Sequence, residues 1–460
     1  MLWRKRFIGS QALGSRVPAA QPALCYSRRV RWYGQNGSMV RPTERPELVE
    51  RLGEGRADEW VGLSRSSGVS LRDASSVADK QVMREGAFME WSYRCTRCEV
   101  LLVPEATTWC CPRCGGVLRI EPPLRLVRDA IDTEDRTLWR YAAALPVARP
   151  PRTLGEGLTP LVEGELDGEP VRFKLDFLLP TGSFKDRGAS VLVAFLAAQG
   201  VRRVTVDSSG NAAAAFAAYA ALHGLEVSVF APAGTSPEKI VQARAYGAEV
   251  EFIAGQRDTV AAAAQVAGRA PETAYASHNW HPLFVEGTKT WLLEVWEQLG
   301  RRWPTACFMP VGGGSLLLGA HLALQALGGN GPALVAAQPE ASAPLVRAWM
   351  RPDQVLEPVE PGVTLAEGTR IGRPPRGELL LETLRMSGGW PEAVPEPLLI
   401  ETTRLLWRQG LFVEPTAALG AAAYRIARRR GWLPEEPVVI VLTGSGLKAA
   451  GAVRHILDQK

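Results

Sequence analysis

The sequence predicts an α/β protein of two lobes, with parallel or mixed open sheets flanked by helices and a small zinc ribbon in front. Two observations support this prediction. From about residue 126 onward, short β-branched runs alternate with alanine-rich helical stretches, which is typical of parallel strand–helix–strand units. Five cysteines lie within residues 95–114, ahead of that alternation.

The first run of the alternation lies between Arg202 and Ala254. An alanine-rich helix is expected to end at Gly224, because glycine is the usual residue just past a helix end. The next helix has Ser236 as a candidate N-cap and Pro237 in its first turn. Strands are expected at residues 201–206, 225–232 and 248–253.

A second run follows, with strands expected at 307–311, 333–340 and 438–444 and a helix expected from Glu414. Two such runs indicate two lobes with a cleft between them, where ligands usually bind. We expect one unit over residues 126–460, with a smaller lobe of about 180–280 inserted in the larger one.

The charge of the chain is concentrated at its start. Residues 1–40 carry seven Lys or Arg and no acid, against a net charge of +5 for the whole chain, so the rest sums to −2. The body therefore has no charge that favours nucleic acid or an anionic membrane. This basic leader is either an organelle transit peptide or an over-extended gene start before Met39. Residues 41–90 are polar and aperiodic, which predicts a linker or arm.

The cysteines of residues 91–121 have the spacing C-x2-C-x12-C-x2-C, formed by Cys95, Cys98, Cys111 and Cys114. Two knuckles of this kind can close a tetrahedral four-sulfur site, which predicts a structural zinc ribbon without an open coordination position. Redox-active thiols are the alternative, and Cys110 could replace Cys111 only in a distorted knuckle. The clustering argues against a secreted disulfide framework and favours a cytoplasmic location.

The segment LLPTGSFKDRGAS, residues 178–190, contains a candidate reactive lysine. Pro180 and Gly182 predict a turn, with Ser183 as N-cap of a helix that begins at Phe184. Lys185 would then lie at the positive end of the helix dipole, and a cationic, partly buried setting lowers the pKa of an amine. Such an amine can form an imine, although a solvated charge triplet at a helix start is the plain alternative.

PTGSFKDRG resembles the lysine motif of threonine synthases, within the fold-type-II enzymes that use pyridoxal 5'-phosphate (PLP). The resemblance covers about residues 150–448. It implies that Lys185 bonds covalently to the cofactor and later carries the Cα proton of the substrate.

Three further motifs occur in the order expected of that family. The resemblance implies that Asn211 contacts the ring hydroxyl of PLP, and that Thr443 lies against the pyridine nitrogen. A neutral hydroxyl there favours eliminations and replacements over transamination. The cofactor phosphate would bind at a glycine loop before a helix, formed by Gly312, Gly313, Gly314 and Ser315. The substrate-binding set would be Ser208, Ser209, Gly210 and Arg187.

The sequence departs from the family at the expected phosphate site of the substrate. The usual asparagine and arginine are His281 and Phe284 here, which removes a bidentate phosphate donor. Lys174, Lys289 and Arg187 remain as possible phosphate contacts. His278 and His281 could act as bases, but packing histidines are commoner in such loops.

The resemblance favours conversion of O-phospho-L-homoserine and water into L-threonine and phosphate. A threonine or serine dehydratase, or another β-eliminating or β-replacing lyase, is the alternative, since only the leaving-group pocket separates the two. A non-catalytic scaffold is a third possibility, disfavoured by the complete set of cofactor motifs. The expected partners are a small amino-acid substrate and a second copy in a homodimer.

Overall fold

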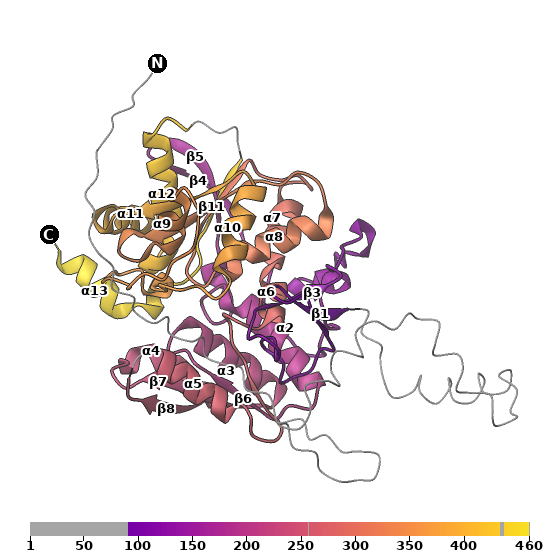
Figure 1. Ribbon diagram of the computed structural model, residues 1–460. Coiled ribbons are helices and arrows are strands. Elements are labelled where there is room, and N and C mark those ends of the chain that lie inside the picture. The colour runs from indigo at the N-terminus through magenta and orange to yellow at the C-terminus, as the bar shows by residue number, and fades with distance from the viewer. Residues whose placement is uncertain (1–90, 256, 433–436, 460) are drawn as a thin grey trace, which may run out of the picture.

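The structure is a computed structural model that describes residues 91–255, 257–432 and 437–459. The predicted leader at 1–40 and the linker at 41–90 lie outside these ranges. Within them the strands form three sheets, of three, four and six strands. Figure 1 shows the two larger sheets in separate lobes, with the small sheet beside α2 and α6.

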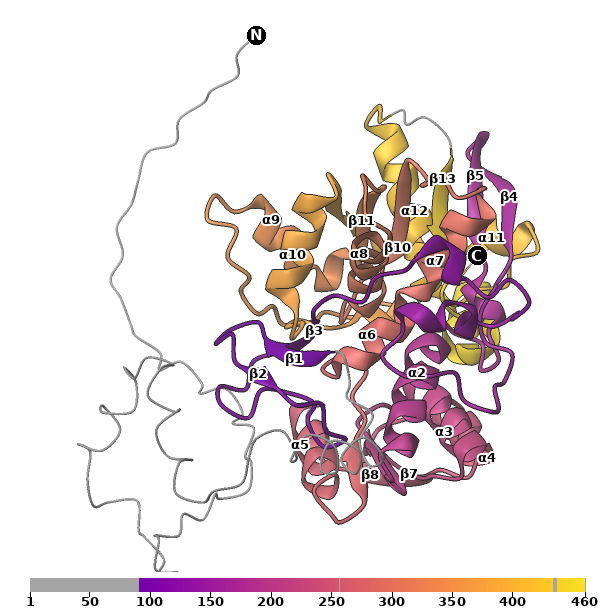
Figure 2. The same ribbon diagram turned by 90° about the vertical axis from the view of Figure 1, so that its right-hand side faces the viewer.

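The three-stranded sheet contains Cys95 at the end of β1 and is antiparallel, in the order β2-β1-β3. Its strands are β1 (Ser92–Cys95), β2 (Leu101–Leu102) and β3 (Leu118–Glu121). Its apolar side chains are not a separate core: Trp91, Tyr93, Leu118 and Ile120 belong to the same buried cluster as Leu192 and Phe195 of α2 (Lys185–Ala198). Figure 2 shows strands β1 and β3 of this segment, the predicted zinc ribbon, beside α6, at the level where the two lobes meet.

The four-stranded sheet is parallel, in the order β8-β7-β6-β9. Its elements are β6 (Arg203–Val206), α3 (Asn211–His223), β7 (Glu226–Pro232), α4 (Pro237–Ala245), β8 (Glu249–Ile253), α5 (Arg257–Ala267) and β9 (Thr273–Tyr275). The strands expected at 201–206, 225–232 and 248–253 are confirmed. Gly224 ends α3 in the left-handed region at φ 74°, and Ser236 is the N-cap of α4.

The six-stranded sheet is mixed, in the order β12-β11-β10-β13-β5-β4. Only its β4–β5 hairpin is antiparallel, because a tight turn joins these two strands whereas helices join the others. The strands are β4 (Leu161–Leu166), β5 (Glu169–Lys174), β10 (Ala306–Pro310), β11 (Ala333–Pro339), β12 (Trp390–Val394) and β13 (Val438–Val441). The two-lobed α/β fold class is confirmed.

The remaining helices pack around this larger sheet and between the lobes. They are α6 (Pro282–Thr288), α7 (Thr290–Gln298), α8 (Ser315–Leu327), α9 (Pro344–Met350), α10 (Gly377–Met386), α11 (Glu396–Arg408), α12 (Pro415–Arg429) and α13 (Ala450–Asp458). Short 3-10 turns occur at Arg128–Ala130, Leu138–Ala144, Asp176–Leu178, Glu340–Ser342, Glu367–Thr369 and Gly446–Lys448. Among the described residues, no helix is both long and apolar enough to span a bilayer.

Candidate active site

Lys185 is the first residue of α2, which packs against α3 and α6 and whose N-cap residue Phe184 is hydrogen-bonded to Thr443, after β13. The helix begins one residue later than expected: Phe184 is the N-cap, and the Ser183 hydroxyl is buried without a hydrogen bond in the described structure. The preceding turn is held instead by the Asp186 carboxylate, which accepts hydrogen bonds from the amide of Thr181 at 2.7 Å and from its hydroxyl. This turn fixes the start of the helix and therefore the position of the Lys185 amine.

The Lys185 amine makes no hydrogen bond or ion pair within the described ranges. Its Nζ lies 4.3 Å from the ring centroid of Phe184 and 5.8 Å from that of Phe284. Burial, together with the Arg257 guanidinium, lowers the pKa of Lys185 to about 8, and Glu414 opposes both effects. A free amine with a lowered pKa is the chemical requirement for forming an imine near neutral pH.

Thr443 is brought next to Lys185 by pairing between two loops. The Thr443 carbonyl accepts from the Phe184 amide at 2.9 Å, and the Ser445 amide donates to the Gly182 carbonyl at 2.9 Å. A β-bridge between Ser183 and Gly444 completes the contact. Residues more than 250 positions apart thus form one wall of the site.

Asn211, at the start of α3, is joined to the same wall through Glu414. Its Nδ2 donates to the two carboxylate oxygens of Glu414 at 3.0 and 3.3 Å. The carboxylate also lies over Gly444, where an added Cβ would come within 2.3 Å of Glu414 Oε1. Burial raises the pKa of Glu414. The sequence indicated Glu414 only as a helix start and gave no signal for this contact.

The glycine loop lies between β10 and α8, as its sequence predicted. Gly314 is the N-cap of α8 with φ 87°, a conformation that favours glycine. A Cβ at Gly313 would meet Asn279 Oδ1 at 2.2 Å, and one at Gly314 would meet Leu380 at 2.3 Å. Backbone this closely covered, at the start of a 13-residue helix that begins with Ser315, suits a phosphate group.

The predicted carboxylate loop follows β6 and leads into α3. Ser208, Ser209 and Gly210 are all partly exposed, and the Gly210 amide donates to Ser208 Oγ at 3.4 Å. Buried polar atoms without a partner in the described structure lie close to this edge of the sheet, on Asp207, Ser277 and His278. Such atoms are compatible with a ligand that supplies the missing hydrogen bonds.

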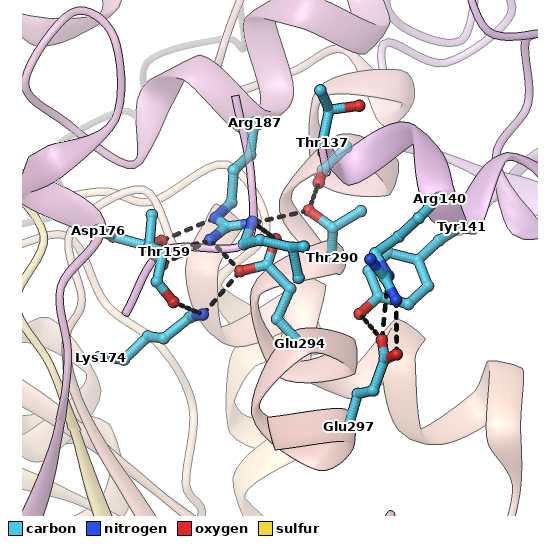
Figure 3. A network of polar contacts seen from close by, with 12 residues as sticks. Thr137, Arg140, Tyr141, Thr159, Lys174, Asp176, Arg187, Thr290, Glu294 and Glu297 are labelled. Carbon is cyan, nitrogen blue, oxygen red and sulfur yellow. Dashed lines mark hydrogen bonds and ion pairs between the residues drawn. The ribbon is translucent and has the colours of Figure 1, made fainter. Parts of the chain in front are cut away.

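Arg187 is not placed to bind a substrate. It is fully buried, and its guanidinium donates to both oxygens of Asp176 at 2.7 and 2.8 Å and to both of Glu294 at 2.6 and 2.8 Å. Figure 3 shows this network, in which Lys174 also donates to Glu294, at 2.7 Å. Both cations are neutralised inside the protein, and Arg187 joins α2 to Asp176 and to Glu294 of α7. The expectation that Arg187 contacts the substrate is therefore corrected.

The other residues of the expected phosphate site are also enclosed. Lys289 is 1% exposed and pairs with Glu286 at 2.5 Å. Phe284 is fully buried, and its ring covers Gly188, where an added Cβ would meet it at 2.6 Å. His281 caps α6 by accepting from the Leu283 amide at 3.3 Å, which is a structural role. Arg257, the cation that lowers the pKa of Lys185, is exposed and makes no hydrogen bond or ion pair with another described residue.

The four predicted metal-ligating cysteines converge on one point. All four sulfurs lie within 4.8 Å of one another, with separations of 3.4 Å for Cys98–Cys114 and 3.5 Å for Cys95–Cys114. Sulfurs about 3.8 Å apart are expected around a tetrahedral zinc ion with Zn–S bonds of about 2.3 Å. A Cβ at Gly116 would lie 2.9 Å from Cys95 Sγ, so the glycine lets the backbone approach the cluster.

Comparisons with known proteins agree with the family that the sequence motifs indicated. Residues 152–444 match the family of pyridoxal-phosphate-dependent enzymes. A threonine synthase of Methanosarcina acetivorans is 30% identical over 80% of this chain and 94% of its own, and one of Methanocaldococcus jannaschii is 30% identical over 77% and 92%. The crystal structure of a threonine deaminase from T.th. has a TM-score of 0.56 and 31% identity, covering 63% of this chain and 92% of its own. Maize serine racemase, 22% identical over 66% and 94% with a TM-score of 0.56, shares the fold.

Proposed function

Because this chain belongs to the pyridoxal-phosphate-dependent enzymes of the threonine synthase family, we propose that it converts O-phospho-L-homoserine and water into L-threonine and phosphate. The observation that carries the PLP chemistry is the amine of Lys185, which has no polar partner among the described residues and a pKa lowered to about 8. The choice of O-phospho-L-homoserine as substrate is supported by the threonine synthases that are 30% identical to this chain. The described residues fit the cofactor in their chemistry: Lys185 offers an amine without a polar partner among them, Asn211 and Thr443 offer polar groups, and the glycine loop offers backbone amides at the start of α8.

PLP, when bound, supplies an electron sink that makes the Cα–H bond of an amino acid acidic. In the proposed mechanism Lys185 would hold the cofactor covalently, and its amine would then take and return the Cα proton. Asn211, oriented by Glu414, would contact the ring hydroxyl, and the Thr443 hydroxyl would interact with the pyridine nitrogen. The amides of Gly312, Gly313 and Gly314, with Ser315, would hold the phosphate of the cofactor.

The loop Ser208–Gly210 is proposed to bind the substrate carboxylate. Its amides lie at the positive end of α3, which favours an anion. With Arg187, Lys174 and Lys289 committed to carboxylates, Arg257 is the cation that we propose for the substrate phosphate. Its guanidinium is exposed and makes no hydrogen bond to another described residue, so it can bind the phosphate in a bidentate manner.

A dehydratase acting on threonine or serine is the second candidate. The observation that favours it is Phe284, an apolar ring buried beside Lys185, at the position where the resemblance to threonine synthases implies a phosphate-binding arginine. Both reactions begin with loss of the Cα proton, so the cofactor residues do not distinguish them.

The deciding experiment is incubation of the purified enzyme with each candidate substrate separately. O-Phosphohomoserine should give equimolar threonine and phosphate, whereas L-threonine should give little product. Formation of 2-oxobutyrate and ammonia from L-threonine, with no phosphate from O-phosphohomoserine, would overturn the synthase assignment and support the dehydratase.

The ribbon is proposed to bind one structural zinc ion through Cys95, Cys98, Cys111 and Cys114. Four thiolates leave no coordination position for a substrate, so the ion stabilises the ribbon and takes no part in the chemistry. A homodimer and a cytoplasmic location stay predictions.

A further inference from the structure

Arg376 lies where the ribbon, the segment after β9 and helix α10 meet. It is 4% exposed, and its guanidinium donates to three backbone carbonyls: Nη1 to Leu118 at 3.1 Å, Nε to Asn279 at 3.3 Å, and Nη2 to Trp280. No described carboxylate forms an ion pair with it. Burial lowers the pKa of Arg376 to about 10, so the side chain is still charged at neutral pH and its hydrogen bonds are charge-assisted.

One of these contacts reaches the metal site directly. Leu118 pairs across the ribbon sheet with Cys95, one of the four clustered cysteines. The ribbon also contacts the segment after β9 through Trp109, whose ring centroid lies 5.7 Å from that of Trp280. A shift of the cysteine knuckles would therefore move the carbonyl that Arg376 binds.

The other two contacts reach the glycine loop. The Asn279 side chain lies over Gly313, at 2.2 Å from an added Cβ, so its position limits the space around that amide. Arg376 is also the N-cap residue of α10, and Leu380 of the same helix covers Gly314. The segment that contains Asn279 and helix α10 both cover the loop, and the Arg376 side chain joins them.

We propose that Arg376 is a positioning residue through which the four-cysteine metal site controls the affinity of the glycine loop for the cofactor. Metal in the ribbon fixes Leu118, Arg376 transmits that position to Asn279 and α10, and these hold the loop in the form that binds phosphate. The inference rests on the proposed cofactor role of the loop and does not depend on which amino acid is the substrate.

The test is a double comparison of PLP dissociation constants, measured by titrating cofactor-free protein and following the absorbance of the bound cofactor. Wild type and Arg376→Lys are each measured zinc-loaded and after chelator treatment, with metal content checked. Lysine keeps the charge but cannot reach three carbonyls. In wild type, metal removal should weaken PLP binding about tenfold, because the loss of groups that support a binding site commonly lowers affinity by about this factor. In Arg376→Lys, binding should be weakened already with zinc present, and metal removal should add little.

Two further variants control for structure. Arg385→Lys changes an exposed arginine of the same helix and should leave both PLP affinity and its metal dependence unchanged. Asn279→Ala leaves the ribbon and Arg376 in place, so it should keep full zinc content while PLP binding weakens. This comparison needs no metal removal and stays decisive if chelated protein or Arg376→Lys does not fold.

Coupling is refuted if metal removal weakens PLP binding by the same factor in wild type and Arg376→Lys, or has no effect in wild type. It is also refuted if Asn279→Ala binds PLP as wild type does. Because no substrate is present, these outcomes are independent of the substrate assignment. A protein that binds no PLP under any condition would contradict the proposed function itself.

Discussion

Around Lys185, burial and two nearby charges set the reactivity of the amine. Burial and Arg257 lower its pKa, whereas Glu414 raises it. Neither partner is near Lys185 in the sequence. Each can be replaced while the lysine is kept, so the two effects can be measured separately.

Removal of the amine gives the most direct prediction. Lys185→Ala should lose the roughly 410–420 nm aldimine absorbance of bound PLP, because the amine that forms the covalent bond is removed. Lys239→Ala, which changes a surface lysine of α4 with 40% exposure, should keep this absorbance. Persistence of the aldimine band in Lys185→Ala would show that another amine holds the cofactor.

A second residue-level prediction concerns pH. Below a pKa of about 8, the fraction of free Lys185 amine falls about tenfold per pH unit, so reconstitution of cofactor-free protein with PLP should slow accordingly. Glu414→Gln removes a charge that stabilises the ammonium, which should move the midpoint of the rate profile to lower pH. Arg257→Gln removes a repelling charge and should move it to higher pH. Shifts in the same direction would contradict this electrostatic account.

At the scale of elements, α2 has to approach α6 closely for the site to form. Gly188, on the fourth position of α2, makes room for the Phe284 ring of α6. The family motif KDRG thus combines a reactive lysine, a turn-fixing aspartate, a buried arginine and a glycine needed for packing.

Gly188→Ala should destabilise the protein by about 1–3 kcal/mol, because its Cβ would lie 2.6 Å from the Phe284 ring in a core that cannot expand freely. Denaturant unfolding measures the change. Gly451→Ala in α13 is the matched control, since nothing lies within 4 Å of an added Cβ there. Alanine in that helix should be neutral or stabilise by up to about 1 kcal/mol, and equal losses at both positions would contradict the packing argument.

At the scale of the whole molecule, a buried ionic network joins elements of distant sequence. Lys174 ends β5, Arg187 lies in α2 and Glu294 in α7, and all three are fully buried. Figure 3 shows Glu294 between the two cations. The network therefore fastens the sheet of the larger lobe to the helix that carries Lys185.

Glu294→Ala should cost about 3–5 kcal/mol in unfolding free energy, because it leaves buried positive charge without compensation. Glu226→Ala breaks a surface ion pair in which the side chain of Arg203 is 46% exposed and that of Glu226 is 68% exposed. This change should cost less than about 1 kcal/mol. Similar costs for the two variants would show that the network contributes no more than a surface pair.

The same network predicts how stability changes in acid. Burial alone would raise the pKa of Glu294, but Arg187 and Lys174 lower it to about 2. A lowered pKa gives a stabilisation that is complete above the unfolded value of about 4.3 and is lost as the pH falls towards about 2. Unfolding free energies of wild type should therefore decrease over this range, and the decrease should be smaller in Glu294→Gln.

Patterns along the chain were sufficient for the features that depend on neighbouring residues. Strand and helix periods located β6, β7 and β8, cysteine spacing located the four-cysteine cluster, and the motif at Lys185 indicated the cofactor family. In each case a few consecutive residues set the backbone geometry or the chemistry, so local pattern was sufficient.

Which charges are free and which are neutralised became clear from the folded molecule alone. Arg187 looked available beside Lys185, yet its partner Glu294 lies 107 positions away, and Asn211 is held by a carboxylate 203 positions away. Arg376 binds a ribbon carbonyl across 258 positions. The energy of a charge depends on burial and on partners brought together by packing, and neither is encoded in the residues next to it.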